Sequence, residues 1–290
     1  MNTLKQFADG INWEVERSTP YTKSVSGLYV PEEGYTALKR DDDGSTLYIT
    51  RKTYTHTKNS TFMEYTQRLS EASGFAIEGY AEFDGGKKVL AYLRSTEDFM
   101  HKHLGLKTQN YFVWGNSHDG STPLFGGGVD FILRCSNQYG RIMKGLKIRH
   151  TKNHDFRVEE FIRLIASFKV EKEAEALMFQ KMDTIKIDSK ILDSLANRLL
   201  KIDETKMKEG DILHPVTGRN KEALMNSLLK ETSELGMTLF GAFNGITHYT
   251  THTKKSTDAY GSILGGNMKF NEQGLLICQE IAEEKGLVLV

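Results

Sequence analysis

The sequence predicts an α+β protein in which an N-terminal, antiparallel-rich sheet, built from hairpins and one helix, precedes a mostly helical C-terminal half. Three observations predict this class. Before about residue 155, short runs of Tyr, Val, Ile, Phe and Thr alternate with turn residues; after it, apolar residues recur at helical spacing; and strands and helices do not alternate throughout. We expect a strand-rich core over 1–154 and a helical region over 155–290 packed on it, with a loop near 203–220.

Two hairpins give the clearest strand signals. Segment 35–55 turns at Asp43-Gly44, and segment 75–95 turns at Asp84, Gly85 and Gly86. An Asp-Gly pair between strand-forming runs favours a tight hairpin turn. Further strands are expected at 110–116, 129–135 and 145–150. The glycines at 126–128 lack the Lys-Ser or Lys-Thr pair of a phosphate loop, so we interpret them as a bulge or a flexible strand entry.

One helix is expected between the hairpins, over residues 60–74. Thr61 and Glu64 have the spacing of a capping box, and Gly74 ends the apolar pattern. A second helix, capped by Asn153 or Asp155, is predicted from one apolar stripe: Val158, Phe161, Ile162, Ile165 and Phe168. More helices are expected near 188–202, 220–235, 237–252 and 272–285.

The composition is that of a globular protein, with 290 residues of which 39% are hydrophobic and 26% charged. The 38 basic and 38 acidic residues cancel, so binding to nucleic acid would have to come from a local patch. No apolar stretch approaches the ~20 residues of a membrane span, and no signal-peptide pattern is present, so we expect a cytoplasmic protein that does not contact membranes. Cys135 and Cys278 match no metal spacing and are expected to be packed thiols.

Segment 116–121 gathers polar side chains directly after a predicted strand: Asn116, Ser117, His118, Asp119, Gly120 and Ser121. Adjacent residues of a strand point to opposite faces, so His118 and Asp119 would form a dyad only where the chain turns. No G-x-S-x-G pattern or second carboxylate accompanies them. We interpret the segment as a structural turn with His118 at its tip or packed beneath it; ligand binding and catalysis are the alternatives.

A two-histidine metal clamp is a further alternative, because His248 and His252 lie one helical turn apart. Tyr249 stands where the metalloprotease pattern has Glu, and no third ligand is identifiable. The sequence therefore indicates no metal site and no cofactor. Histidines followed by Lys254 and Lys255 are also expected at a helix C-terminus, where cations are favourable.

Two windows without Asp or Glu, residues 44–63 and 131–154, predict a nucleic-acid surface. Along an extended chain Leu47 and Ile49 take one face, while tyrosines and cations take the other. Rings stack on the bases of single strands, and Lys or Arg neutralises phosphates; ordinary strand residues beside solvated lysines are the alternative. The candidate residues are Tyr48, Lys52, Tyr54, His56, Lys58, Arg134, Arg141, Lys144, Lys147, Arg149 and Lys152.

Four motifs, "NSHDGST", "GGGVDFILRCSNQYG", "LKIRHTKNHDFRVEEFIRLI" and "LFGAFNGITHYTTH", occur in the order and spacing of the domain of unknown function 932 family. The chain resembles that family over nearly its whole length. The resemblance implies a protein of a bacteriophage, a plasmid or another mobile genetic element. The family has no established enzymatic activity. The resemblance also implies which residues fit the family motifs, but it assigns them no chemical role. These residues are 116–121, Cys135, Asn137, Gln138, Arg149, His150, Thr151, Asn153, Phe243, Asn244, Tyr249 and His252. His248 departs from the family, whose members often carry an acid there, which argues against a metal clamp.

These observations favour a protein of a phage or mobile element, in a bacterial host, that binds single-stranded DNA and assists annealing or recombination. One alternative is a metal-dependent phosphodiesterase or nucleotide enzyme, in which His118 and Asp119 join His150 or His252. The other is a counter-defence protein that binds a host or phage protein through its helical half. The sequence leaves open the choice between DNA and RNA, and homo-oligomerisation.

Overall fold

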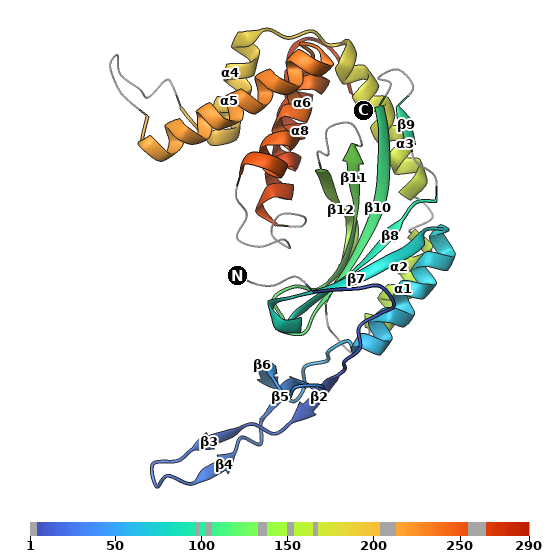
Figure 1. Cartoon of the computed structure of the whole chain (residues 1–290), viewed down its shortest axis with the longest axis vertical. Helices are drawn as coiled ribbons and strands as arrows, with labels where there is room; N and C mark the ends of the chain where they lie inside the picture. Colours follow the sequence, from blue (N-terminus) through green and yellow to red (C-terminus); the bar gives the residue numbers. More distant parts are fainter. Residues whose placement is uncertain are drawn as a thin grey trace. The chain divides into compact units, whose positions relative to one another are not determined.

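The structure is a computed structural model that describes residues 5–96, 99–101, 106–132, 138–149, 154–164, 168–203, 213–254 and 265–289. The chain divides into two compact units. Unit 1 consists of Met1–Glu97, Tyr111–Gly128 and Ile142–Ser167, and unit 2 of Asp98–Asn110, Val129–Arg141 and Phe168–Val290. The fold class is the predicted one: an N-terminal region of antiparallel strands with one helix, followed by a mostly helical half (Figure 1).

The described strands form three sheets. The largest has the order β1-β7-β8-β10-β11-β12, with β9 paired to β10; a second has the order β2-β5-β6, and β3 pairs only with β4. The strands are β1 Lys5–Phe7, β2 Val15–Ser18, β3 Tyr21–Lys23, β4 Tyr29–Pro31, β5 Tyr35–Arg40, β6 Thr46–Arg51, β7 Ala76–Phe83, β8 Lys88–Arg94, β9 Phe99–His101, β10 Leu106–Ser117, β11 Leu124–Ile132 and β12 Gln138–Ile148.

Both predicted hairpins are confirmed. Strands β5 and β6 pair antiparallel on either side of Asp43-Gly44, and β7 and β8 pair antiparallel around a short 3-10 turn, Asp84–Gly86. Leu38 of β5 and Leu90 of β8 are fully buried at the centres of their strands. Local turn chemistry therefore sufficed to place these four strands.

Helix α1 (Asn59–Ser73) follows β6, and its predicted end is confirmed by Gly74, whose φ of 72° closes the helix in the left-handed region. The predicted capping box is wrong, because the helix begins at Asn59 and Thr61 lies inside it. The carboxylate of Glu14 takes the capping role instead. It accepts hydrogen bonds from the backbone N–H groups of Asn59 (2.8 Å) and Ser60 (3.0 Å).

Helix α2 (His154–Leu164) packs on α1 within unit 1. Arg68 of α1 forms an ion pair with Glu159 of α2, and Val158 of the predicted apolar stripe is fully buried. Asp155 lies inside α2 rather than capping it, whereas Asn153 and Ile165 lie outside the described residues.

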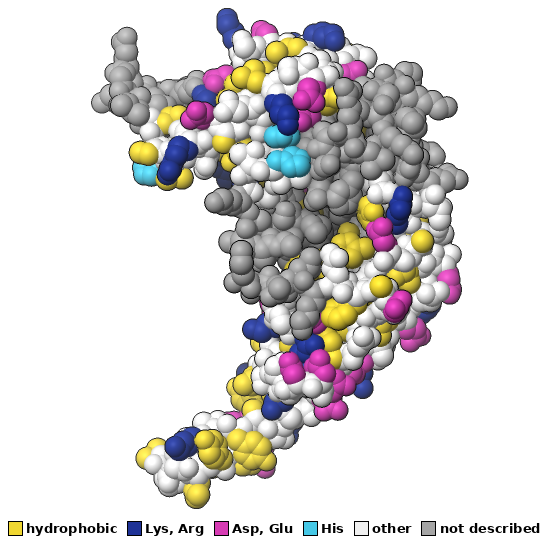
Figure 2. Space-filling view, in the orientation of Figure 1, with side chains coloured by type: hydrophobic (Ala, Val, Ile, Leu, Met, Phe, Trp, Pro, Cys, Tyr) yellow, Lys and Arg dark blue, Asp and Glu magenta, His cyan; other side chains and the backbone are white. Residues whose placement is uncertain are grey.

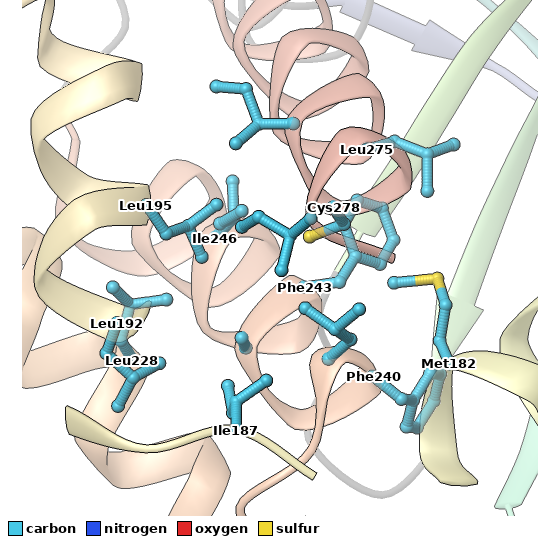
Figure 3. Close-up of a cluster of buried hydrophobic side chains, with 14 of the residues drawn as sticks. Met182, Ile187, Leu192, Leu195, Leu228, Phe240, Phe243, Ile246, Leu275 and Cys278 are labelled. Carbon is cyan, nitrogen blue, oxygen red and sulfur yellow. The ribbon is translucent and has the colours of Figure 1, made fainter. Parts of the chain in front are cut away.

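Unit 2 contains α3 (Phe168–Thr184), α4 (Ser189–Leu200), α5 (Pro215–Leu235), α6 (Leu239–His248) and α8 (Gly266–Glu284). Their apolar faces form one core (Figure 3), to which α3 contributes Met182, α4 Leu195, α5 Leu228, α6 Phe243 and α8 Cys278. Cys278 is the buried thiol that the sequence predicted, and burial raises its pKa to about 12. The other cysteine, Cys135, lies outside the described residues.

Several predicted boundaries are wrong. Helix α3 was not expected, α5 begins at Pro215 rather than near 220, and α8 begins at Gly266 rather than 272. Strand β11 begins at Leu124, so the glycines at 126–128 lie within the strand rather than at its entry. Strand β12 occupies 138–148 rather than 145–150. A π-helical turn, Tyr249–Thr253, ends the segment expected as one helix over 237–252.

None of the helices in the described ranges is both long enough and apolar enough to cross a membrane.

Candidate functional site

The polar segment after β10 is a turn with a buried first half. Asn116, Ser117 and His118 are all fully buried. The Asn116 amide donates to the carbonyl of Thr57 (3.1 Å), and the Ser117 hydroxyl donates to the carbonyl of Thr122 (2.6 Å). The turn is therefore held both to itself and to the connection that leads into α1.

The second half of the turn reaches the surface. The Asp119 carboxylate accepts from the backbone N–H of Ser121 (2.9 Å), which is the local turn contact expected from the sequence. Gly120 has a φ of 68°, and the ring of Tyr48 lies just beyond the place where a side chain would begin. The turn thereby supports a surface tyrosine from a different hairpin.

His118 lies beneath the turn, where its ring contacts Trp13 and Asn59. Its Nε2 lies 2.8 Å from the Asn59 amide oxygen, and the Trp13 ring meets it edge to face at 5.6 Å. Asn59 in turn donates to the carbonyl of Trp13 (3.0 Å). The imidazole therefore joins the start of α1 to the N-terminal strand segment, and the predicted structural role accounts for its contacts.

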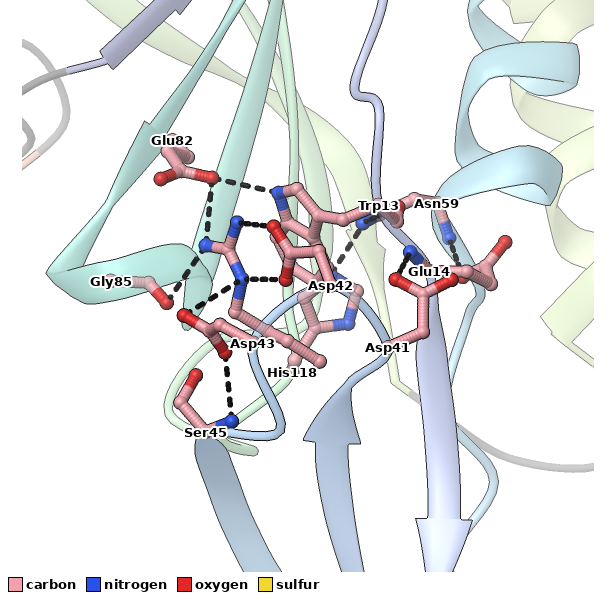
Figure 4. Close-up of polar contacts among 11 residues, drawn as sticks. Trp13, Glu14, Asp41, Asp42, Asp43, Ser45, Asn59, Glu82, Gly85 and His118 are labelled. Carbon is pink, nitrogen blue, oxygen red and sulfur yellow. Dashed lines mark hydrogen bonds and ion pairs between the residues drawn. The ribbon is translucent and has the colours of Figure 1, made fainter.

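A second buried polar cluster lies beside Trp13 (Figure 4). The Glu82 carboxylate, 1% exposed, accepts from the Trp13 indole N–H (2.7 Å) and from the Arg40 guanidinium (3.0 Å). Arg40 also holds Asp42 through two hydrogen bonds of 2.8 and 2.7 Å, and it stacks 4.1 Å above the Trp13 ring. The cluster ties β5, β7 and the N-terminal segment together, and nothing in the sequence pattern indicated it.

The extended face predicted for residues 48–58 is wrong beyond Arg51, where β6 ends. Residues 52–58 form a turn and an irregular connection to α1. Leu47 is buried, whereas Ile49, which was expected on the same face, is 55% exposed. Tyr48 and Tyr54 are nevertheless brought together, with ring centroids 6.1 Å apart in an edge-to-face arrangement.

The two tyrosines differ in exposure. Tyr48 is 36% exposed, whereas Tyr54 is half-buried, and burial, followed by the nearby Tyr48 and Asp119, raises its pKa to about 12. Tyr54 therefore remains a neutral phenol at any physiological pH. Tyr48 is the ring that the surface offers, with Tyr54 behind it.

Arg17 organises the irregular connection after β6, although the sequence pattern did not single it out. Its guanidinium donates to the carbonyls of Lys52 (3.3 Å) and Tyr54 (2.5 Å) and to Nδ1 of His56 (3.4 Å). Burial and the adjacent Arg17 charge lower the pKa of His56 to about 4. His56 is therefore a neutral acceptor in this segment, not the cation that the sequence prediction assumed.

Exposed cations surround the connection. Arg17, Arg51, Lys52 and Lys58 are all exposed, and none of them forms an ion pair with a carboxylate in the described ranges. Together with Tyr48 and Tyr54 they are called the 48–58 surface below. Glu14, an acid close to Arg17 in the sequence, is already bound to the N-terminus of α1.

The second basic window is described in part. Lys147 and Arg149 are exposed on either side of the buried Ile148, at the end of β12. Arg134, His150 and Lys152 lie outside the described residues, as do the side chains of Arg141 and Lys144.

His248 and His252 of unit 2 do lie together, with ring centroids 4.8 Å apart. His248 contacts Lys230 (3.0 Å) and Ser227 (3.2 Å), and burial, followed by Lys230 and His252, lowers its pKa. A lysine amine beside a ring nitrogen is unfavourable for a bound cation. Among the side chains that the structure places, no group of three His, Cys, Asp or Glu residues could hold a metal ion.

Fold and site thus define an α+β protein whose buried polar turn supports an exposed, cation-bearing connection. The family described as Domain of unknown function (DUF932) matches residues 46–273. The chain belongs to this family, as its motifs predicted. Neither the curated proteins nor the solved structures contain a match to the chain.

Proposed function

We propose that the protein binds single-stranded nucleic acid, most simply single-stranded DNA, through the 48–58 surface. The observation that carries the proposal is the presence of exposed cations around Tyr48 and the connection that follows β6: Arg51 ends β6, Lys52 and Lys58 lie on the connection, and Arg17 of β2 binds its backbone. Bases of any sequence stack on an exposed ring, while unpaired cations neutralise the phosphates between them. The protein as a whole has no net charge, so its overall charge does not attract nucleic acid. Binding therefore needs a local group of cations such as this one.

In this proposal the tyrosines and the cations of the 48–58 surface have different roles. Tyr48 stacks on a base, and Tyr54 supports it from behind without presenting a charge. Lys52 and Lys58 contact phosphates, and the buried Asn116 keeps the connection in place through Thr57. Lys147 and Arg149 of the same unit supply further phosphate contacts. The buried polar turn acts as a brace and performs no chemistry.

The biological setting of this proposal rests on the family resemblance, which implies a phage, a plasmid or another mobile element. A protein of a phage or another mobile element that coats single strands would hold them for annealing or recombination, in the cytoplasm of the bacterial host. Binding without base contacts would be tolerant of sequence, because every base offers a ring face.

The test is a titration of a labelled single-stranded oligonucleotide, followed by fluorescence anisotropy at several salt concentrations. We expect binding that weakens with salt, and Lys52→Ala should reduce the slope of log K against log salt by about 0.7. Lys190→Ala is the matched control, because Lys190 is an exposed lysine of α4 in the other unit. Absence of salt-sensitive binding, or equal effects of the two variants, would refute the proposal.

The aromatic half of the proposal has its own variant pair. Tyr48→Ala should weaken binding by about 1–3 kcal/mol, because one stacked base loses its ring. Tyr48→Phe keeps the ring and should bind almost as well as the parent. If both variants lose affinity equally, the phenol rather than the ring is responsible and stacking is excluded.

A further inference from the structure

A second surface, distinct from the proposed nucleic-acid site, lies on the hairpin of β3 and β4. From Tyr21 to Tyr35 every side chain is exposed except that of Ser24, which is half-buried. The exposed side chains include Tyr21 (62%), Leu28 (69%) and Tyr29 (70%). Figures 1 and 2 show this hairpin continuing beyond β2, β5 and β6 with hydrophobic side chains along it. A two-stranded hairpin that buries nothing has little stability of its own.

The hydrogen bonds within the hairpin determine which backbone N–H and C=O groups point outward, away from the neighbouring strand. Ser24 N donates to Leu28 O (2.8 Å) and Glu32 N donates to Pro20 O (2.9 Å), so these two pairs belong to the hydrogen-bonded positions of the ladder. Such positions alternate with non-bonded ones in an antiparallel pair. The register pairs Tyr21 with Pro31 and Lys23 with Tyr29, which places the backbone groups of these four residues on the outer edges.

The two outer edges are not equivalent. On β4, Pro31 has no N–H to offer, so that edge is interrupted. On β3, Tyr21 and Lys23 both present an N–H and a carbonyl outward, and no other described strand pairs with them. The open edge of this hairpin is therefore β3.

We infer that the open edge of β3 pairs with β3 of a second copy of this chain. An antiparallel pair centred on Thr22 places Tyr21 opposite Lys23 of the partner subunit, and the reverse on the other side of the axis. Because Tyr21 and Lys23 carry the outward groups, this register makes both of these pairs hydrogen-bonded. It also brings each Lys23 ammonium beside a tyrosine ring, a favourable cation–π contact.

Charge decides between this partner and nucleic acid. The hairpin from Tyr21 to Tyr35 carries Lys23 against Glu32 and Glu33, so its own charge is negative and does not attract phosphates. The self-complementary edge favours a second copy over an unrelated strand, because both halves of the contact are then supplied by the same residues. Strand pairing without a shared core gives weak association, on the order of micromolar or weaker.

The first experiment measures the dissociation constant of the full chain by sedimentation velocity over a concentration series. Lys23→Pro removes an outward N–H from each copy without removing a hydrogen bond of the hairpin, and should weaken the dimer at least about tenfold. Tyr29→Pro makes the same change on the β4 edge and should leave the dimer unchanged. A chain that stays monomeric at its highest soluble concentration, or equal effects of the two prolines, would overturn the inference.

The second experiment traps the register. In the proposed pair the two Thr22 residues face each other at a non-bonded position, where Cα atoms lie about 4.5 Å apart, a spacing that a disulfide spans. Thr22→Cys should therefore form a covalent dimer under mild oxidation. Val30→Cys, on the neighbouring strand of the same hairpin, should not, and the parent chain shows the background from its own cysteines. Equal cross-linking of both variants, or none with Thr22→Cys, excludes this register.

Discussion

At the scale of single residues, the contacts that organise unit 1 are polar and buried. Glu82 joins Trp13 and Arg40, and His118 joins Trp13 to Asn59. A buried charge without its partner is costly, so such residues hold the fold only as a complete set. The 48–58 surface depends on them, because its connection is anchored to the same buried turn.

Glu82 provides the most direct test of this dependence. Glu82→Ala leaves the buried Arg40 with only the more exposed Asp42 and Asp43 as acidic partners among the described residues, so we expect a loss of about 3 kcal/mol in the free energy of unfolding. Urea denaturation followed by tryptophan fluorescence suits this measurement, because both tryptophans, Trp13 and Trp114, lie in unit 1. Glu78→Ala, an exposed position of the same strand, is the control and should change stability little. Equal effects would show that the cluster does not stabilise the unit.

Glu14 links stability to pH. Burial raises the pKa of Glu14, but hydrogen bonds from Ser60, Val15 and Asn59 together lower it below its ordinary value of 4.5. A lowered pKa in the folded state means that the stabilisation is complete above about pH 4.5 and is lost as the pH falls through the folded value. Glu14→Ala should therefore cost about 1 kcal/mol near neutral pH, the usual value of a helix cap.

The same variant should approach the parent as the solution becomes acidic, because protonation removes the cap from the parent as well. Denaturant midpoints measured at several pH values test this, with the exposed Glu16→Ala as control. A deficit that stays constant through the acid range would mean that the Glu14 charge contributes nothing.

At the scale of elements, α5 and α6 pack through glycine. A Cβ on Gly245 of α6 would lie 2.5 Å from the Cα of Leu228 on α5, closer than real side chains approach a backbone. Gly245→Ala must therefore separate the two helices, and we expect a loss of about 1–3 kcal/mol. Gly218→Ala, in the first turn of α5, meets only Leu213 at 4.0 Å and should stabilise by about 0.5–1 kcal/mol.

Thermal denaturation followed by far-ultraviolet circular dichroism distinguishes the two glycine variants by sign. Opposite shifts of the midpoint are expected, downward for Gly245→Ala and upward for Gly218→Ala. Equal shifts would indicate that helix propensity, rather than close backbone contact, determines the response.

The elements that the sequence predicted correctly are those whose determinants are local. Asp-Gly turns placed two hairpins, and Gly74 placed the end of α1. The start of α1 was predicted to within one residue, but its cap was missed because Glu14 lies 45 residues away. Helix α3 was not predicted; among its described side chains, the buried hydrophobic ones are Met178, Phe179 and Met182, all near its C-terminal end.

At the scale of the whole molecule, the sequence indicated some residues of the candidate 48–58 surface but not the geometry of that surface. Tyr48, Lys52 and Lys58 were identified from an acid-free window, whereas Arg17, which shapes the connection, comes from another strand. Alternation along an extended chain could not reveal that β6 ends at Arg51. Long-range contacts made by a single side chain leave no periodic signal in the sequence.

The pH dependence of nucleic-acid affinity distinguishes binding driven by the overall charge of the protein from binding driven by the local cations of the 48–58 surface. The isoelectric point is about 7.1, so the overall charge changes sign between about pH 6 and about pH 9. Lys and Arg stay protonated across that range, and His56, with a pKa of about 4, stays neutral. Binding through the 48–58 surface should therefore be nearly independent of pH in this interval.

Anisotropy titrations at constant ionic strength across this interval measure the effect directly. Affinity that falls steadily as the overall charge becomes negative would show that bulk charge, rather than the local cations, drives association. A sharp fall centred near pH 6.5 would instead implicate a histidine outside the 48–58 surface, because only an ordinary imidazole titrates there. A flat profile combined with steep salt dependence is expected only when a few fixed cations carry the contact, because salt screens them whereas pH in this range does not change their charge.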